Sequence, residues 1–141
     1  MAETAPSRDE FERQVGPSRF DELLETEWVS DEPGEARVRV DVRDDLRQPF
    51  GLVHGGVLSS LVESVCSRAT ARAVHADGKA AMGQSITVSF LRPVRDGRIE
   101  VTARARHRGS TTWIWQAEVA DAEGRLCALA QMTMAVRSLR A

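Results

Sequence analysis

One long predicted helix most limits how this chain can fold. It begins at Gly55-Gly56, continues to about His75 and ends at Asp77-Gly78, a length of roughly 31 Å at 1.5 Å per residue. The flanking segments are predicted strands, because apolar and polar residues alternate in them and turns rich in Gly, Asp and Pro separate them. A sheet of about six antiparallel strands that curls around the helix would bury it, so we expect an α+β fold with one long central helix.

The other predicted elements follow from the same periodicities. Strands are expected over residues 20–30, 36–42, 81–91, 98–108, 112–121 and 126–137, and a short amphipathic helix over residues 9–15. Residues 1–8 are expected to form a disordered tail. We therefore expect residues 1–19 to be an N-terminal tail with a short helix, and residues 20–141 to form one domain, a size that buries roughly two thirds of the unfolded surface.

Charge and composition exclude several kinds of partner. The chain carries 19 basic and 21 acidic side chains, so it lacks the positive excess that is typical of nucleic-acid binding. The polar opening MAETAPSRDE is unlike a signal peptide, and the sequence contains no apolar stretch of 18 residues that could cross a membrane. Cys66 and Cys127 lie in apolar stretches without metal-ligand spacing, which indicates small buried residues in a reducing compartment. We expect a cytoplasmic protein with no nucleic-acid or membrane partner, no metal and no other cofactor.

A single carboxylate, Glu63, lies on the polar side of the predicted helix. At roughly 100° per residue, that side also carries small or hydroxyl-bearing residues: Gly56, Ser59, Ser60, Ser67 and Thr70. The opposite side carries apolar residues: Leu58, Leu61, Val65 and Ala69. A carboxylate on a helix that is predicted to be buried is unfavourable unless it is paired, protonated or used, so Glu63 is a candidate functional group. An ion pair with Arg68 or Arg72 is disfavoured, because neither residue lies on the Glu63 side.

The start of the same helix is a candidate for polarising a carbonyl group. Its first backbone N–H groups, at Gly55 and Gly56, lack partners within the helix and lie at the positive end of the helix dipole. A carbonyl oxygen that gathers negative charge would be stabilised there.

The motifs in and around this helix resemble those of a known family. The matching residues are Gln48-Pro49-Phe50-Gly51, His54-Gly55-Gly56, Glu63-Ser64, Ser67, Arg92-Pro93-Val94, Gly97-Arg98 and Gly124-Arg125-Leu126-Cys127. With these residues, the chain from about Phe20 to Val136 resembles the hotdog-fold acyl-CoA thioesterases. Within them it is similar to the hydroxybenzoyl-CoA and dihydroxynaphthoyl-CoA thioesterase branch, which is related to the phenylacetate-pathway thioesterases.

The resemblance implies how a thioester would be hydrolysed. Thioesters need few catalytic groups, because their carbonyl is electrophilic and thiolate is a fair leaving group. By resemblance, the Gly55 N–H polarises the carbonyl, and Glu63 acts either as a nucleophile that forms an acyl-enzyme anhydride or as a general base on water. Ser67 would bond the carboxylate or the attacking water. Gln48 would hold the carbonyl or the water, and His54 would approach the thioester.

Each of the supporting residues also has a purely structural interpretation. His54 could cap the helix or brace the turn, and Gln48 could be an ordinary hydrogen-bonding residue of the loop. Ser67 could be an ordinary small residue of the helix. His75 and His107 match no motif position and are interpreted as surface residues.

Two further sets of residues are candidates for binding the substrate. The CoA set combines cations with hydroxyl and backbone donors that suit phosphates or the pantetheine arm: Arg92, Arg108, Gly109, Ser110 and Thr111. A solvated hairpin is the alternative for residues 106–112. The acyl set lies before the helix and in the strand after it: Phe50, Met82, Gln84, Val88 and Phe90. Ser89 stands where some aryl-CoA members of the family carry a histidine, so the identity of the acyl group stays open.

The resemblance also implies that the protein assembles from several copies. A sheet wrapped around one helix leaves a strand edge uncovered, and the family forms dimers with a continuous sheet, commonly paired again into tetramers. A site at the subunit interface would let Gln48 face Glu63 of the partner subunit. We therefore expect a homo-oligomer that hydrolyses an acyl-CoA to the free acid and CoA. The open alternatives are a non-catalytic acyl-CoA-binding protein, a hydrolase of carrier-protein thioesters, and a hotdog dehydratase or hydratase.

Overall fold

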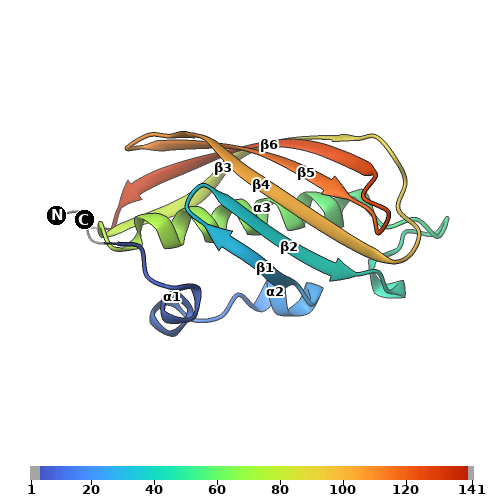
Figure 1. The fold of residues 1–141 in the computed structure, drawn as a ribbon, viewed down its shortest axis with the longest axis horizontal. Helices are drawn as coiled ribbons and strands as arrows, with labels where there is room; N and C mark the ends of the chain where they lie inside the picture. Colours follow the sequence, from blue (N-terminus) through green and yellow to red (C-terminus); the bar gives the residue numbers. More distant parts are fainter. Residues whose placement is uncertain (1–3, 140–141) are drawn as a thin grey trace.

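In the computed structural model, which describes residues 4–139, one long helix lies against one face of a six-stranded antiparallel sheet (Figure 1). The helix is α3 (Gly55–His75). The strands are β1 (Glu27–Glu32), β2 (Glu35–Asp41), β3 (Lys79–Phe90), β4 (Arg98–Arg108), β5 (Thr112–Ala120) and β6 (Leu126–Ser138). Their order in the sheet is β1-β2-β4-β5-β6-β3, so the strand that follows α3 in the chain lies at one edge. The α+β fold expected from the sequence is confirmed.

The core lies between α3 and the sheet. The apolar side of the helix is buried as predicted, with Leu61 and Val65 fully inaccessible. Thr70 is also buried. Its Oγ1 accepts a hydrogen bond from the Trp115 indole N–H at 2.8 Å and donates one to the Cys66 carbonyl at 2.7 Å. Thr70 therefore faces the sheet and not the exposed polar side. The polar groups that enter the core at this point satisfy one another.

The strand predicted over residues 20–30 is wrong in its first half. A short helix, α2 (Arg19–Leu24), occupies this part, and β1 begins only at Glu27. The Ser18 Oγ caps α2 by accepting a hydrogen bond from the Asp21 N–H at 3.3 Å. A Ser followed by an acidic residue three positions later is a helix-start pattern, and the apolar residues around it concealed that signal.

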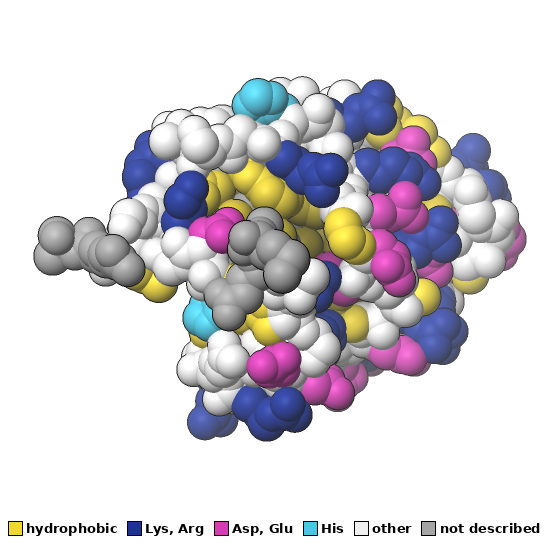
Figure 2. Space-filling view, turned by 60° about the vertical axis from the view of Figure 1, so that its left-hand side comes forward, with side chains coloured by type: hydrophobic (Ala, Val, Ile, Leu, Met, Phe, Trp, Pro, Cys, Tyr) yellow, Lys and Arg dark blue, Asp and Glu magenta, His cyan; other side chains and the backbone are white. Residues whose placement is uncertain are grey.

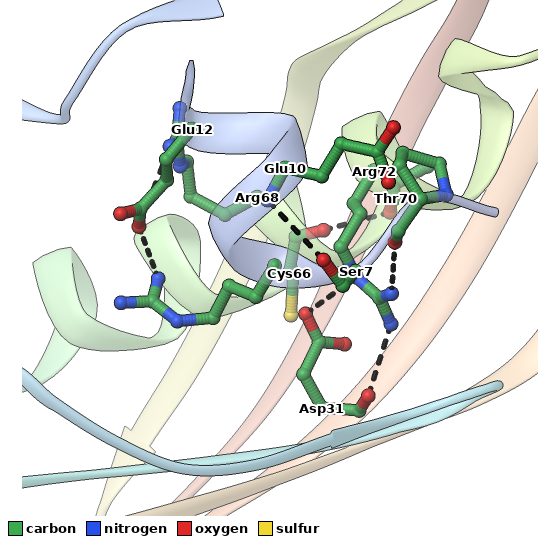
Figure 3. A network of polar contacts seen from close by, with 10 residues as sticks. Ser7, Glu10, Glu12, Asp31, Cys66, Arg68, Thr70 and Arg72 are labelled. Carbon is green, nitrogen blue, oxygen red and sulfur yellow. Dashed lines mark hydrogen bonds and ion pairs between the residues drawn. The ribbon is translucent and has the colours of Figure 1, made fainter. Parts of the chain in front are cut away.

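The segment before α2 is bound to the C-terminal half of α3 through Arg72 (Figure 3). The Arg72 Nε lies 2.8 Å from the Asp31 Oδ2 of β1, and only 12% and 8% of these two side chains are exposed. The same guanidinium donates a hydrogen bond to the Pro6 carbonyl at 2.6 Å. The expected disordered tail is thus wrong for residues 6–8, while residues 1–3 lie outside the described residues.

The predicted short helix is confirmed as α1 (Arg8–Val15), and it packs on the same half of α3. Its Phe11 is buried, with the Arg68 guanidinium 5.1 Å from the ring centroid and the His75 ring edge-on at 5.3 Å. The His75 Nε2 also lies 2.7 Å from the Gln14 Oε1. His75 is therefore partly exposed at the surface, where it packs against α1, and His107 is exposed as predicted.

One edge of the sheet and several large apolar side chains are exposed. As the last strand of the sheet, β3 pairs only with β6 among the described strands, which leaves its other edge without a neighbour. Met82, Phe90, Leu91 and the loop residue Phe50 are all more than half exposed. On the face shown in Figure 2, basic and acidic side chains are mixed. None of the described helices is long and apolar enough to cross a membrane.

Candidate active site

The start of α3 presents one free backbone donor. His54 caps the helix, and its Nδ1 accepts a hydrogen bond from the Gly56 N–H at 2.8 Å, so the capping interpretation of His54 is confirmed. Within residues 4–139, no hydrogen bond from the Gly55 N–H is formed. A Cβ atom on Gly55 would lie 3.0 Å from the Phe90 ring, so the glycine permits this ring to pack closely over the helix start. The Gly55 N–H is therefore available to an outside acceptor.

Glu63 lies two turns further along α3 and is exposed, although the sequence predicted a buried carboxylate. Its Oε1 is 3.0 Å from the position that a Cβ atom would take on Gly83 of β3, so the carboxylate lies against the backbone of the edge strand. Arg68 and Arg72 contact other partners, as predicted. No residue in the described part of the chain pairs with Glu63 or donates a hydrogen bond to its carboxylate. The chain thus holds an unpaired carboxylate at its surface.

The Gly55 N–H and the Glu63 carboxylate are separated within one chain. Eight residues of helix place their Cα atoms about 12 Å apart along the axis. Gly55 lies beneath Phe90, whereas Glu63 lies beside Gly83, which is roughly 23 Å of strand away along β3. A reacting carbonyl needs its donor about 3 Å from the oxygen and its nucleophile about 3 to 3.5 Å from the carbon. One chain alone therefore does not bring both groups to one carbonyl.

A hollow of about 290 Å³ opens beside Glu63. Its lining is mostly hydroxyl-bearing or charged, with one aromatic ring: Ser18, Phe20, Ser60, Glu63, Ser64, Ser67 and Arg68. The Ser67 Oγ makes its contact with the Met134 Sδ at 3.7 Å, so a hydrogen bond to the carboxylate is not formed in this state. Ser67 nonetheless shares the hollow with Glu63, as its position on the helix predicted.

Gln48 is engaged in its own turn. Its Oε1 accepts a hydrogen bond from the Phe50 N–H, and its backbone N–H donates to the Leu52 carbonyl at 2.8 Å. Its carbonyl accepts from the Gly51 N–H at 2.9 Å. Within one chain, Gln48 therefore braces the loop before α3 and is not among the residues that line the hollow at Glu63.

The residues expected to hold CoA are not brought together in one chain. The bend from Arg108 to Thr111 lies at the start of β3, where the Lys79 Nζ donates a hydrogen bond to the Ser110 carbonyl at 3.3 Å. Arg92 follows the other end of the same strand, 12 residues or roughly 40 Å away. Within a single copy, either Arg92 or the bend from Arg108 to Thr111 can therefore contact the phosphates of one CoA molecule, but not both.

The bend itself is a tight hairpin. The Gly109 N–H donates to the Thr112 carbonyl at 2.9 Å, and a Cβ atom on Gly109 would lie only 2.8 Å from that oxygen. The Arg108 guanidinium lies 6.0 Å from the Trp113 ring centroid and contacts the turn at Gly34. Arg108 forms no ion pair with the described residues, so its charge is available to an anion.

Arg92 borders a hollow of about 340 Å³ with charges of both signs. Arg125, which also lines it, is held by Asp121 at 2.8 Å. Although desolvation raises the pKa of Asp121, the hydrogen bonds from Arg125 hold that pKa below its ordinary value. Arg92 and Arg95 form no ion pair within residues 4–139 and are the free cations of this hollow.

The residues expected to contact the acyl group lie along the exposed edge. Met82, Gln84, Val88 and Phe90 belong to β3, and a shift in its pairing with β6 between Gly83 and Ser85 leaves Gln84 out of the ladder. Phe50 lies at the tip of the loop before α3. Phe50, Met82 and Phe90 are more than half exposed, so these side chains lie open to solvent in the single chain.

The two cysteines are buried, as predicted. Burial raises the pKa of both the Cys66 and the Cys127 thiol. Because the thiolate is the reactive form, this environment does not favour either residue as a nucleophile.

One wall of the site was missed by the sequence analysis. A second hollow, of about 500 Å³, lies between α2 and the start of α3 and shares Phe20 and Ser60 with the hollow at Glu63. Most of its apolar lining comes from Phe20, Leu23, Leu24, Leu46 and Val57. The Ser18 and Asp21 spacing could have revealed α2, but nothing in the sequence indicates that this helix lies beside α3.

The comparisons with known proteins agree with this geometry. Residues 50–128 match the model of the thioesterase superfamily. The chain is 33% identical to a 1,4-dihydroxy-2-naphthoyl-CoA hydrolase from Listeria monocytogenes over 84% of this chain and 96% of the relative. It is 36% identical to an enzyme of the same name from Escherichia coli, over 78% of this chain and 79% of the relative.

A similar fold is found among solved structures. The thioesterase HI1161 from Haemophilus influenzae superposes with a TM-score of 0.86 and 26% identity, over 99% of this chain and 96% of the other. The family resemblance drawn from the motifs around His54 and Glu63 is thereby confirmed. The chain belongs to the thioesterase superfamily and is a hydrolase with the hotdog fold.

Proposed function

We propose that this enzyme hydrolyses an acyl-CoA to the free acid and CoA, at sites that two copies of the chain build together. The observation that carries the proposal is the exposed and unpaired Glu63 carboxylate on α3, in a chain of the thioesterase superfamily. The relatives named 1,4-dihydroxy-2-naphthoyl-CoA hydrolases support CoA thioesters as the substrate class.

In the proposed mechanism, Glu63 supplies or activates the attacking oxygen. As a nucleophile, its carboxylate adds to the carbonyl carbon, the C–S bond breaks, and water then hydrolyses the resulting anhydride. As a general base, it takes a proton from water while the water oxygen forms the new C–O bond. In both routes CoA leaves as the thiolate, and the Gly55 N–H of the partner subunit stabilises the negative charge on the carbonyl oxygen.

The edge strand supports the role of a second copy. If two β3 strands pair antiparallel about a two-fold axis, the start of one strand lies beside the end of the other. The Phe90 end of one copy, with Gly55 beneath it, then approaches the Gly83 region of the other, where Glu63 lies. The exposed apolar side chains on β3 would be covered by the same contact.

The same pairing would bring the remaining predicted residues to the site. Gln48, His54 and Phe50 would arrive with Gly55 from one copy, and Ser67 with Glu63 from the other. The bend from Arg108 to Thr111, at the start of β3, would lie beside the helix start of the partner, where it could bind the CoA phosphates. We propose the homodimer as the smallest active unit, and the pairing of two dimers stays a prediction.

A thiol-release assay across a panel of acyl-CoAs tests the proposal. We expect steady release of CoA from at least one acyl-CoA by the wild-type protein and almost none by the Glu63→Gln variant. Calorimetry on the same panel identifies a protein that only binds. Tight binding of acyl-CoAs without any release would contradict the proposed activity.

A further inference from the structure

We infer that the trough between α2 and α3 holds the acyl group of the thioester, and that Phe20 and Leu23 select apolar acyl groups larger than acetyl. The trough is the hollow of about 500 Å³ between α2 and the start of α3. Its apolar lining comes from Phe20, Leu23, Leu24, Leu46 and Val57, and its other lining residues are Arg43, Asp45, His54, Gly56 and Ser60. This inference rests on the proposed thioesterase function.

The trough lies beside the hollow at Glu63. It shares Phe20 and Ser60 with the hollow at Glu63, so the two hollows are neighbours along one side of α3. The positions from Ser60 back to His54 span about 9 Å of helix axis. An acyl group whose carbonyl carbon lies at Glu63 can therefore extend directly into the trough.

The two hollows differ in the chemistry of their linings. Around Glu63 the lining is rich in hydroxyl groups, which suits a carbonyl, a water and a developing charge. In the trough, the one serine hydroxyl is already used, because the Ser60 Oγ donates to the Gly56 carbonyl at 2.7 Å. Arg43 and Asp45, which also line the trough, form an ion pair at 4.0 Å. Apart from His54 and Gly56, the remaining wall is aliphatic and aromatic, and it favours an apolar ligand.

Two large apolar side chains of α2 are exposed beside the trough. Phe20 and Leu23 are 49% and 68% exposed, while Leu24 on the same short helix is buried. The Arg43 guanidinium holds α2 by donating to the Leu23 carbonyl at 2.5 Å and to the Leu24 carbonyl at 3.1 Å. Large apolar groups on a rigid support, next to a candidate catalytic carboxylate, are typical of a preformed binding site.

The volume agrees with this occupant. A hollow of about 500 Å³ lies within the range of small-molecule pockets, roughly 300 to 1,000 Å³. An acetyl group would leave most of the trough unfilled. The trough therefore predicts that kcat/KM rises from acetyl-CoA to octanoyl-CoA or to aryl-CoAs such as benzoyl-CoA.

The test measures kcat/KM of the full-length protein for acetyl-CoA, octanoyl-CoA and benzoyl-CoA. The variants are Phe20→Ala and Leu23→Ser, and the matched control is Leu139→Ser, which changes a similarly exposed leucine at the end of the described chain. We expect Phe20→Ala to lower the preference for the best large substrate over acetyl-CoA by about tenfold or more, and Leu23→Ser to lower it by less. Leu139→Ser should leave the preference unchanged.

The alternative outcomes are distinguishable. Equal loss on all substrates, or an unchanged preference in both variants, would overturn the inference while leaving the thioesterase function intact. A change in molar mass by light scattering with an unchanged preference would show that a second copy covers the trough, which also overturns it. If the wild-type protein releases CoA from none of the substrates, the proposed function itself fails. Because Leu23 is largely exposed, Leu23→Ser keeps the test valid if Phe20→Ala does not fold.

Discussion

The two halves of α3 differ in what covers them and in whether their charged residues are paired. The C-terminal half is contacted by α1 and β1, and Arg72 forms an ion pair with Asp31 there (Figure 3). Phe11 of α1 packs between Arg68 and His75. The N-terminal half leaves the Gly55 N–H free and Glu63 exposed without a partner among the described residues. Charged side chains are paired in the C-terminal half, whereas Glu63 in the N-terminal half is unpaired among the described residues.

Whether a charged side chain has a partner indicates the role of that side chain better than its position on a helix does. Arg72 and Glu63 belong to the same helix, but of these two only Arg72 forms an ion pair, with Asp31. A buried ion pair of this kind is strongly destabilising when one partner is removed, because the other charge is left without compensation. An exposed unpaired carboxylate has no such structural role. Substitutions in the two halves should therefore separate stability from activity.

The largest expected effect is on activity, in the open half. Glu63→Gln keeps the shape of the side chain but can act neither as a nucleophile nor as a base, so we expect turnover to fall by at least about 10²-fold. The temperature of unfolding should stay close to that of the wild type, because the carboxylate has no partner in the described chain. Thiol release and thermal melting on one sample measure both quantities. Wild-type turnover in this variant would exclude Glu63 from the mechanism.

The next effect is on stability, in the covered half. Arg72→Ala removes one partner of a nearly buried ion pair and should lower the free energy of unfolding by about 3 to 5 kcal/mol. The control is Arg104→Ala, which breaks an exposed ion pair with Glu35 and should change stability by about 1 kcal/mol or less. Urea unfolding gives both values. Equal losses in the two variants, or a loss of turnover per folded molecule in Arg72→Ala, would remove the distinction between the halves.

A smaller effect is expected in the CoA contacts. If Arg108 binds a phosphate, Arg108→Ala loses a charge-assisted hydrogen bond of about 1.5 to 3 kcal/mol, which raises KM for acyl-CoA by about tenfold or more. KM for an acyl-pantetheine without those phosphates should barely change. As a control, Arg98→Ala removes an exposed cation that is paired with Asp41 and should affect neither substrate. If Arg108→Ala raises KM equally for both substrates, or for neither, the bend is a structural hairpin and does not bind phosphate. Arg92 is then the next residue to test.

Local signals explain which parts of the fold could be predicted. The bounds of α3 follow from glycines at its start and Asp77-Gly78 after its end, and the structure confirms Gly55 to His75. The six residues of α2 have too few turns for a clear periodicity, and their packing against α3 depends on contacts far apart in the sequence.

The candidate site was predictable as a set of residues but not as an arrangement. The spacing of His54 and Glu63 on one helix identified both of them, and the fold confirms that they lie on α3 or at its start. Periodicity places Glu63 on a side of the helix but cannot say what covers that side. It also cannot show that Arg92 and Arg108 lie at opposite ends of β3, because that depends on the path of the strand.

The central claim is that Gly55 and Glu63 act on one thioester from two different copies. Gly55 is the first helical residue, a position where proline is tolerated, and His54 before it has the extended conformation that proline requires, with φ −61° and ψ 132°. Gly55→Pro thus removes the N–H donor and keeps the helix start. Gly55→Ala is its matched control, because its Cβ meets the same Phe90 ring while the N–H is retained.

The most direct measurement is the turnover of a mixed dimer in which one copy carries Gly55→Pro and the other Glu63→Gln, purified through a different tag on each copy. Each variant alone should be almost inactive, with a loss of about 10² to 10³-fold for the missing donor. The mixed dimer keeps one site with an intact Gly55 and an intact Glu63, so it should recover about half of the wild-type turnover. A mixed dimer as inactive as its two parents would place both groups in the same chain and contradict the account.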